Sequence, residues 1–295
     1  MRFATYKTQN NPSEQVGIMY PGDSRMYDIS LYGLQFRDMN DLIKSISSEQ
    51  LDALKKFPAP DKGYIEREDY IMLAPIPFPL QDVICLGFNY MDHASELSHL
   101  QKNDYTAKNP KAIYFSKRVN EAVGDNGTIP LHEQIEPFLD YEVELAVIIG
   151  KTAKNVPPEN VYDHIFGYTV LNDVSARTIQ NSHSQWYFGK SLDGATPMGP
   201  YIVTADEIPY PPSLEIKSYV NGSLRQHNNT ANLIFGISHV ISELSHGMTL
   251  LPGTVISTGT PSGVGFALNP PQNLKRGDVV VCEIEKIGRL INVVY

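Results

Sequence analysis

The most constraining feature of this chain is a short apolar run that carries Glu142 and Glu144 near its start. It reads Asp140-Tyr141-Glu142-Val143-Glu144-Leu145-Ala146-Val147-Ile148-Ile149-Gly150. Side chains alternate along a strand, so Glu142 and Glu144 share one face. Two carboxylates about 5–7 Å apart in a half-buried place raise each other's pKa and destabilise the fold unless a cation joins them. The run therefore indicates either a pair of metal ligands or an edge strand with a solvated, charged end.

A second strand-like run, Gly167–Asp173, ends on an acid and is expected to turn into a short helix. Asp173 either caps that helix, since Asp is a preferred capping residue, or completes a three-carboxylate site with Glu142 and Glu144. Three hard oxygen ligands, with no cysteine and no spaced pair of histidines, favour Mg²⁺, Mn²⁺ or Ca²⁺ over zinc.

The remaining pattern predicts an α+β protein with two units. Residues 1–72 are expected to form a small N-terminal domain with two strands and a polar helical stretch, in which Ser47-x-x-Gln50 is a capping pattern. Proline-rich breaks at 57–60 and 74–79 precede a larger domain, residues 80–295, with a rolled or barrel-like mixed sheet. Its expected strands are Val83–Asn89, Ala112–Phe115, Tyr141–Ile149, Phe166–Asp173, Tyr201–Thr204, Leu214–Val220, Thr254–Thr258 and Val279–Glu285.

Two local signals complete this picture of the larger domain. An apolar stripe predicts a helix over Thr230–Ser245, with Gly247 as a stop signal. Asn221-Gly222 after an alternating strand predicts a type I′ hairpin.

Bulk properties exclude several functions. The formal charge is −9 and no Lys/Arg run exceeds two residues, which argues against nucleic-acid binding. We find neither a signal-peptide pattern nor about 18 consecutive apolar residues, so we expect a cytoplasmic protein without a membrane partner. Cys85 and Cys282 lie in apolar, strand-like runs and are expected to be buried thiols in a reducing compartment.

Three further segments could carry chemistry. His93 and Glu96 are three residues apart on a short predicted helix, so they are either a solvated pair or a catalytic dyad. Lys190 stands alone among turn-forming residues, where a solvent-facing charge is the simple alternative. The glycines of 257–265 would let backbone N–H groups approach an anion, but the segment lacks the lysine of a phosphate loop.

Taken together, these segments resemble the fumarylacetoacetate hydrolase family, in order from about Ile84 to the C-terminus. The motifs are Gly87-x-Asn89-Tyr90-x-x-His93-x-x-Glu96, Asp140-Tyr141-Glu142-x-Glu144-Leu145-Ala146, Asn172-Asp173-x-Ser175-Ala176-Arg177, Gly189-Lys190-Ser191-x-Asp193 and Thr258-Gly259-Thr260-Pro261-x-Gly263-Val264-Gly265. The chain looks most like bacterial acylpyruvate hydrolase and oxaloacetate decarboxylase members.

The resemblance implies a site of nine residues and a homodimer of mixed β-roll domains. It implies Mg²⁺ or Mn²⁺ at Glu142, Glu144 and Asp173, and a lid that brings the catalytic His93 and Glu96 over the substrate. It further implies Lys190 as a catalytic residue and substrate contacts from Arg177, Gln180 and Thr260. We expect lid residues near Ser98–Lys108 to select the substrate, while Trp186, Tyr187 and Phe188 either line the pocket or belong to the core.

The implied reaction is metal-dependent hydrolysis of a C–C bond in a 2,4-dioxo acid such as an acylpyruvate or fumarylpyruvate. His93 and Glu96 would activate water, while the metal and Lys190 stabilise the enolate. Oxaloacetate decarboxylation, and hydration or isomerisation of a 2-oxo acid, remain open because the same residues serve them. A binding protein that holds a 2-oxo acid without turnover is the alternative outside catalysis.

Overall fold

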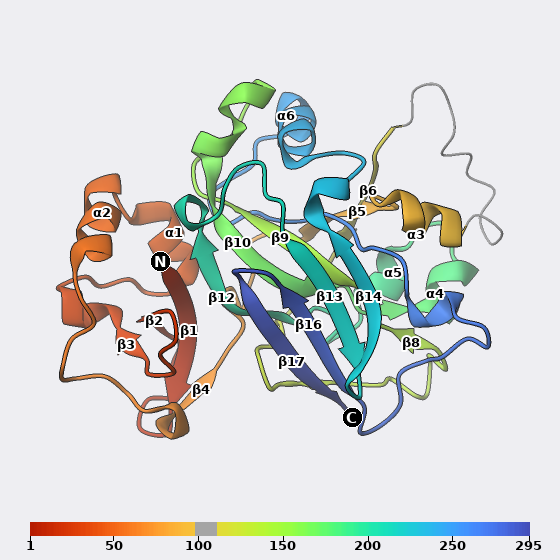
Figure 1. The fold of residues 1–295 in the computed structure, drawn as a ribbon, viewed down its shortest axis with the longest axis horizontal. Coiled ribbons are helices and arrows are strands. Elements are labelled where there is room, and N and C mark those ends of the chain that lie inside the picture. The colour runs from red at the N-terminus through yellow and green to blue at the C-terminus, as the bar shows by residue number, and fades with distance from the viewer. Residues whose placement is uncertain (98–110) are drawn as a thin grey trace.

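The computed structural model describes residues 1–97 and 111–295, and within them the strands form three sheets (Figure 1). The largest has ten strands in the order β3-β2-β1-β12-β10-β9-β15-β5-β6, with β4 beside β1. Their bounds are β1 (Arg2–Thr8), β2 (Gln15–Met19), β3 (Tyr27–Asp28), β4 (Tyr70–Met72), β5 (Val83–Gly87), β6 (Ile113–Lys117), β9 (Val143–Ile149), β10 (Ile165–Asn172), β12 (Met198–Thr204) and β15 (Val255–Ser257).

The second sheet has five strands in the order β14-β13-β16-β17-β7, and Figure 1 shows it lying across the strands of the first. Its strands are β7 (Thr128–Ile129), β13 (Glu215–Val220), β14 (Ser223–Asn229), β16 (Val279–Ile284) and β17 (Gly288–Val294). A two-stranded ladder joins β8 (Leu139–Asp140) to β11 (Ser175–Ala176).

Helices are few and short in the described residues, which confirms the α+β class. The α-helices are α1 (Met39–Ser45), α2 (Ser48–Lys56), α3 (Met91–Glu96), α4 (Arg177–Ser182), α5 (Tyr187–Lys190) and α6 (Ile237–Gly247). Short 3-10 turns are η1 (Ile29–Tyr32), η2 (Arg67–Asp69), η3 (Pro158–His164), η4 (Ala205–Glu207), η5 (Thr230–Asn232) and η6 (Gly265–Ala267). None of the helices in the described ranges is long and apolar enough to cross a membrane.

Strand β9 lies between two apolar cores. Val143, Leu145 and Val147 belong to the core shared with the five-stranded sheet, whereas Ala146 and Ile148 pack into the core shared with the N-terminal unit. Because both faces are covered, the strand is almost continuously apolar, as its sequence is. Period two then assigns Glu142 and Glu144 to the face of Ala146 and Ile148, at the end of the strand.

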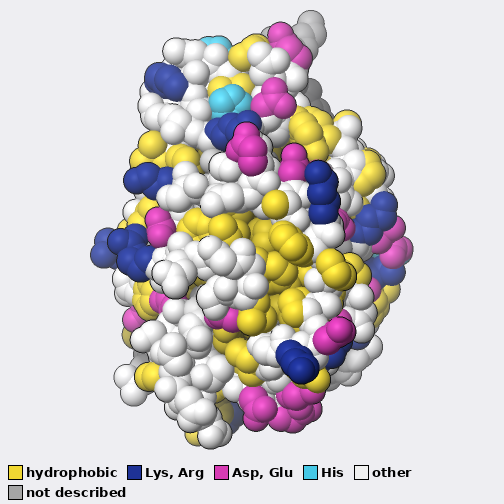
Figure 2. All heavy atoms as spheres, turned by 90° about the vertical axis from the view of Figure 1, so that its left-hand side faces the viewer, with side chains coloured by type: hydrophobic (Ala, Val, Ile, Leu, Met, Phe, Trp, Pro, Cys, Tyr) yellow, Lys and Arg dark blue, Asp and Glu magenta, His cyan; other side chains and the backbone are white. Residues whose placement is uncertain are grey.

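The N-terminal strands extend the large sheet instead of forming a sheet of their own. Strand β1 pairs with β12, with Phe3 opposite Ile202. A boundary between residues 72 and 80 stays a prediction; the chain from 73 to 82 lies between β4 and β5. Figure 2 views the molecule from the side of this unit, where hydrophobic side chains gather at the centre of the face and charged groups lie around them.

Most expected elements are present within a few residues of their predicted ends, but the predicted helix Thr230–Ser245 is wrong at its start. Helix α6 begins at Ile237. Residues 230–232 form the 3-10 turn η5, and Leu233 pairs with Tyr90 in an isolated bridge. The chain stays out of a helix up to Gly236 because Asn89 binds its backbone: Asn89 Oδ1 accepts from Phe235 N at 2.7 Å and Nδ2 donates to Phe235 O at 3.0 Å. The apolar side chains of Leu233 and Ile234 therefore extended the helical pattern without belonging to a helix.

Local turn and cap signals are confirmed. Asn221 and Gly222 connect β13 to β14 with positive φ angles of 51° and 78°, as a type I′ turn requires. The capping box at α2 is present, since Gln50 N donates to Ser47 Oγ and Ser47 N donates to Gln50 Oε1.

We predict that Ser47→Ala lowers the free energy of unfolding by about 1 kcal/mol, because the Gln50 N–H loses its capping acceptor. Urea denaturation followed by circular dichroism measures the change, with Ser13→Ala in an exposed loop as the control. Equal stability of the two variants would contradict a contribution from this cap.

Candidate functional site

Glu142, Glu144 and Asp173 meet where β9 and β10 end. Leu171 pairs with Glu144 across the two strands, and Asp173 N donates to Glu142 O at 2.8 Å. One carboxylate oxygen from each of the three residues lies within 4.8 Å of the others, and all three side chains are buried. We call these residues the carboxylate trio.

Both simpler alternatives for these acids are wrong. Strand β9 lies between β10 and β15, so Glu142 and Glu144 are not at a solvated sheet edge. The residue before helix α4 is Ala176, so Asp173 is not its N-cap.

Neighbouring polar groups fix the orientation of each acid. Glu144 Oε2 accepts hydrogen bonds from Ser257 Oγ at 2.6 Å and Gly259 N at 2.8 Å. The Glu142 backbone N–H donates to Asn172 Oδ1 at 2.9 Å. These bonds come from β10 and from the end of β15 with the loop that follows it, so segments distant in sequence define the site.

Three buried cations surround the trio. Lys190 Nζ donates to Glu142 Oε2 at 2.8 Å and to Asp173 Oδ2 at 2.7 Å. Lys117 Nζ donates to Asp173 Oδ1 at 2.5 Å, and Arg177 Nη1 lies 2.7 Å from Glu142 Oε1. The alternative of a solvent-facing Lys190 is therefore wrong: its side chain is 2% exposed.

The three carboxylates of the trio are not equally compensated by the neighbouring cations. Burial opposes ionisation of Glu142, but the charges of Lys190 and Arg177 outweigh it and hold the pKa of Glu142 below its ordinary value. Burial, together with the negative charges of Asp173 and Glu142, raises the pKa of Glu144 well above its ordinary value. Burial also acts against a charged Lys190, yet Asp173 and Glu142 raise its pKa. Glu144 is thus the carboxylate that the nearby cations compensate least.

The trio fits an oxygen-preferring divalent ion. Its donors are three buried carboxylates on converging strand ends, and carboxylate oxygens are the preferred protein ligands of Mg²⁺ and Mn²⁺. A cation held by all three residues would also offset the repulsion that Glu144 experiences. The identity of the ion stays a prediction.

His93 and Glu96 are paired on α3. His93 Nδ1 lies 3.3 Å from Glu96 Oε2, and Glu96 Oε1 accepts from Gly263 N at 2.9 Å. His93 is 4% exposed, so the alternative of a solvated helix pair is wrong.

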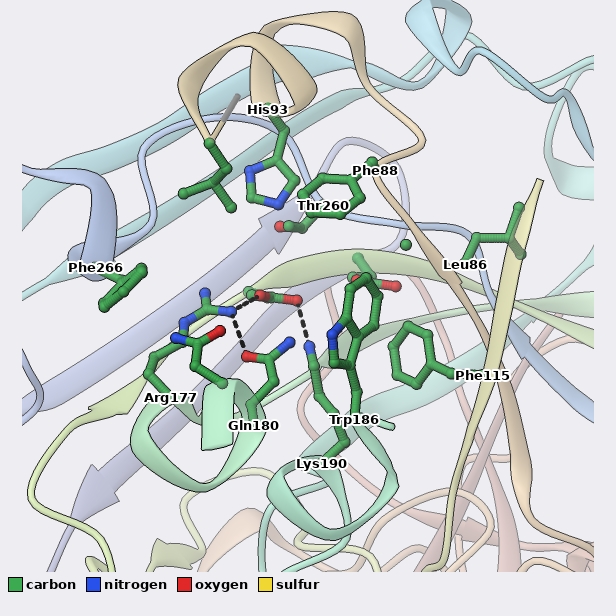
Figure 3. A pocket seen from close by; sticks show the side chains of 15 residues that line it. Leu86, Phe88, His93, Phe115, Arg177, Gln180, Trp186, Lys190, Thr260 and Phe266 are labelled. Carbon is green, nitrogen blue, oxygen red and sulfur yellow. Dashed lines mark hydrogen bonds and ion pairs between the residues drawn. The ribbon is translucent and has the colours of Figure 1, made fainter. Parts of the chain in front are cut away.

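Glu142 and Glu144 of the trio and His93 of the pair line one cavity (Figure 3). His93 and Phe88 lie on one side of it, whereas Arg177, Gln180 and Lys190 project from the other side, on α4 and α5. The described lining consists of Leu86, Gly87, Phe88, His93, Leu97, Phe115, Glu142, Glu144, Arg177, Gln180, Asn181, Trp186, Lys190, Thr260 and Phe266. The predicted lid segment, Ser98–Lys108, lies outside the described residues.

The predicted substrate-binding side chains differ in whether their polar atoms already have hydrogen-bond partners. Gln180 Oε1 accepts from Arg177 Nη1 at 3.1 Å, and in the described part of the chain its amide nitrogen has no hydrogen-bond partner. The Thr260 hydroxyl already donates to Val143 O at 2.9 Å and accepts from Gln226 Nε2 at 2.7 Å. Gln180 therefore offers a free donor, whereas Thr260 would have to exchange an existing bond.

The three aromatic residues at 186–188 separate. Trp186 lines the cavity and packs edge-on against Phe88 and Phe115. Tyr187 and Phe188 are 42% and 49% exposed and lie outside the described lining, so they are neither pocket nor core.

Sequence reasoning missed Lys117 and the role of Asp140. Lys117 ends a short apolar strand, and nothing in its neighbours signals that its ammonium group reaches Asp173. Asp140 Oδ2 accepts from Arg177 Nε at 2.9 Å, and its two oxygens also accept from Gly265 N and Phe266 N. Its place directly before the Glu142 motif was the available signal.

Residues 82–295 match the family described as fumarylacetoacetate (FAA) hydrolase C-terminal, and the chain belongs to this family. A curated relative is the oxaloacetate tautomerase YisK of Bacillus subtilis, 44% identical over 220 residues that cover 74% of this chain and 71% of the relative.

Solved structures agree over the full chain. A fumarylacetoacetate hydrolase from psychrophilic Exiguobacterium antarcticum superposes with a TM-score of 0.81 at 35% identity, covering 100% of this chain and 99% of that one. Maleylpyruvate hydrolase from Sphingobium sp. SYK-6 gives 0.77 at 29% identity, with the same coverages of 100% and 99%. Members of this family are enzymes, which supports catalysis over binding alone.

We predict that Glu144→Gln weakens Mn²⁺ binding by at least about 100-fold, since even residues that only orient metal ligands typically contribute 10–100-fold. Isothermal titration with Mn²⁺ alone measures the affinity, and Glu133→Gln, at an exposed surface position, is the matched control. Unchanged affinity in the Glu144 variant would remove this residue from the ligand set.

Proposed function

We propose that the protein is a divalent-metal-dependent enzyme that interconverts the enol and keto forms of a small 2-oxo dicarboxylic acid such as oxaloacetate. The observation that carries this proposal is the cavity lined both by Glu142 and Glu144 of the carboxylate trio and by the buried His93, which is paired with Glu96. Tautomerisation needs a way to stabilise negative charge at the C2 oxygen and one group that moves a proton at C3. The name of the Bacillus subtilis relative supports the same reaction.

The trio and Lys190 form the charge-stabilising side of the proposed site. Mg²⁺ or Mn²⁺ held by Glu142, Glu144 and Asp173 would act as a Lewis acid on the 2-oxo acid. Lys190 is fixed by two of these carboxylates and keeps its positive charge beside them, where it favours an anionic oxygen on the substrate.

His93 is the proposed proton carrier. Glu96 accepts from Nδ1–H in the tautomer that leaves Nε2 as the free base, and the His93 side chain is itself buried. In the direction from enol to keto form, protonated His93 gives its proton to C3 while the enol O–H proton leaves to solvent. His93 then takes a proton from water, so no net proton is gained or lost.

Arg177 and Gln180 are proposed to orient the substrate. Arg177 is held by Asp140 and Glu142, and it in turn fixes the Gln180 carbonyl oxygen. The Gln180 amide nitrogen is thereby available as a donor to a substrate carboxylate. The rigidity of this chain of contacts favours one orientation of the substrate.

A second candidate is hydrolysis of the C3–C4 bond of a 2,4-dioxo acid, with His93 activating a water. The likeness to maleylpyruvate hydrolase, together with the same acid–base pair, favours it as the alternative. Decarboxylation of oxaloacetate is a third use of the same residues. Both alternatives release pyruvate or its enol form, whereas tautomerisation conserves the carbon skeleton.

We predict that the enzyme with Mg²⁺ accelerates the loss of enol absorbance of freshly dissolved oxaloacetic acid above the rate with Mg²⁺ alone. His93→Ala is expected to lower this rate by about 10²–10⁴-fold because the proton carrier is lost. Titration with Mn²⁺ should give an unchanged affinity for that variant.

The matched control is His239→Ala, since His239 also has a glutamate partner on its helix, Glu243, but is exposed. Pyruvate is assayed in parallel from oxaloacetate and from acetylpyruvate. Faster metal-dependent pyruvate release than enol loss would replace the proposal by decarboxylation or C–C hydrolysis, and turnover of neither substrate would favour a binding role.

We also propose that the protein forms a homodimer, as the family resemblance implies. Light scattering at micromolar concentration is expected to give about twice the chain mass of 33.0 kDa.

A further inference from the structure

Helix α3, which carries His93, needs attachment from outside itself. It has six residues, and a helix of this length is unstable in isolation. Its N-cap residue, Tyr90, provides no side-chain cap within the described structure. Its apolar contacts belong to a small cluster around Phe88, Ala94 and Leu97, separate from the two large cores.

Asp92 and Glu96 attach α3 to the loop after β15. Asp92 Oδ2 accepts from Ser262 Oγ at 2.8 Å and from Asn228 Nδ2 at 2.7 Å. Glu96 binds the next residue of that loop, Gly263. The helix is thus joined at two points on either side of His93, and both Asp92 and Glu96 lie outside the described cavity lining.

The Asn228 amide has a defined orientation. Its Oδ1 accepts from Asn229 N at 2.7 Å and from Asn232 Nδ2 at 2.8 Å, so its Nδ2 is the group that faces Asp92. Asp92 also holds its own helix start, since Oδ1 accepts from His93 N at 2.8 Å. The Asp92 carboxylate therefore links the backbone of His93 to Asn228 on β14 and to Ser262 in the loop after β15.

We propose that Asp92 is a positioning residue that holds the His93–Glu96 pair over the carboxylate trio through Ser262 and Asn228. The proposal rests on the proposed function for the reaction that it affects. Asp92 does not line the described cavity itself, so its effect on the reaction comes through the placement of His93. Loss of its contacts lets α3 leave the cavity and lowers the fraction of molecules with His93 in place.

The test begins with Asp92→Asn. Asp92 Oδ2 accepts from two donors, and this change replaces it with an amide nitrogen or with a neutral oxygen. If the nitrogen takes that place, it faces the Nδ2 group of Asn228, so that two donors oppose each other. If the oxygen takes it, the acceptor no longer carries a charge. We expect kcat for oxaloacetate tautomerisation to fall about 10-fold or more, with a smaller change in KM and an unchanged affinity for Mn²⁺ alone.

The double variant Asp92→Asn/Asn228→Asp restores the link with its polarity reversed. The new carboxylate at 228 can accept from the amide at 92 and still accept from Asn229 N and Asn232 Nδ2, while the Ser262 hydroxyl can turn to accept. We expect kcat within about threefold of the unsubstituted enzyme. If Asp92 acted only through its negative charge at position 92, moving the carboxylate to position 228 would not restore kcat.

Hydrogen exchange of the protein with Mn²⁺ and without substrate provides a readout that is independent of turnover. Amides of 91–97 are expected to exchange at least about 10-fold faster in Asp92→Asn and to recover in the double variant, while those of 143–149 stay unchanged. Met91→Ala, on the exposed side of the same helix, is the control and should match the unsubstituted protein.

The outcomes separate this proposal from the proposed function. Faster exchange at α3 with rescue, in an enzyme that lacks tautomerase activity, would keep the positioning role and overturn the reaction. An active enzyme in which Asp92→Asn changes neither kcat nor exchange would overturn the positioning role. Loss of Mn²⁺ affinity or of exchange protection throughout the chain would also overturn it, since that result indicates general destabilisation.

Discussion

The repulsion among Glu142, Glu144 and Asp173 is the constraint on which the neighbouring structure depends. Their burial at the ends of β9 and β10 follows from the register of these strands and from the apolar cover on both faces of β9. An isolated buried carboxylate is costly, so three within 4.8 Å require compensation. Lys117, Lys190 and Arg177 supply part of it, and each of them comes from a different element.

The cations that compensate the buried carboxylates are connected with the proposed reaction. Two of these cations, Lys190 and Arg177, also line the cavity where a substrate oxyanion would form in the proposed reaction. His93 reaches that cavity from the opposite side, on a helix that belongs to neither large core. In the proposed reaction, the large sheet would hold the charged groups, whereas α3, which has few apolar contacts, would carry the proton transfer. Local stability is often lowest where active sites open.

Sequence alone was sufficient for most strands of the large sheet and for the residues of the trio, but it did not predict β17. Period two in 142–144 and the acid at the end of 167–173 are local patterns, and the family motifs ordered them along the chain. Contacts between distant segments were not predictable in this way. The reach of Lys117 to Asp173 and the link from Asp92 to Ser262 depend on tertiary packing. The error at 230–236 has the same cause, because Asn89, from a distant segment, binds the backbone of Phe235 and keeps the chain before Ile237 out of the helix that its own pattern predicted.

The most direct test of this account is anomalous diffraction from a crystal of the protein grown with Mn²⁺. The account predicts one strong anomalous peak per chain, within bonding distance of carboxylate oxygens from Glu142, Glu144 and Asp173. A peak at another site, or no peak while the protein remains active in excess chelator, would contradict the assignment of the trio as the metal centre.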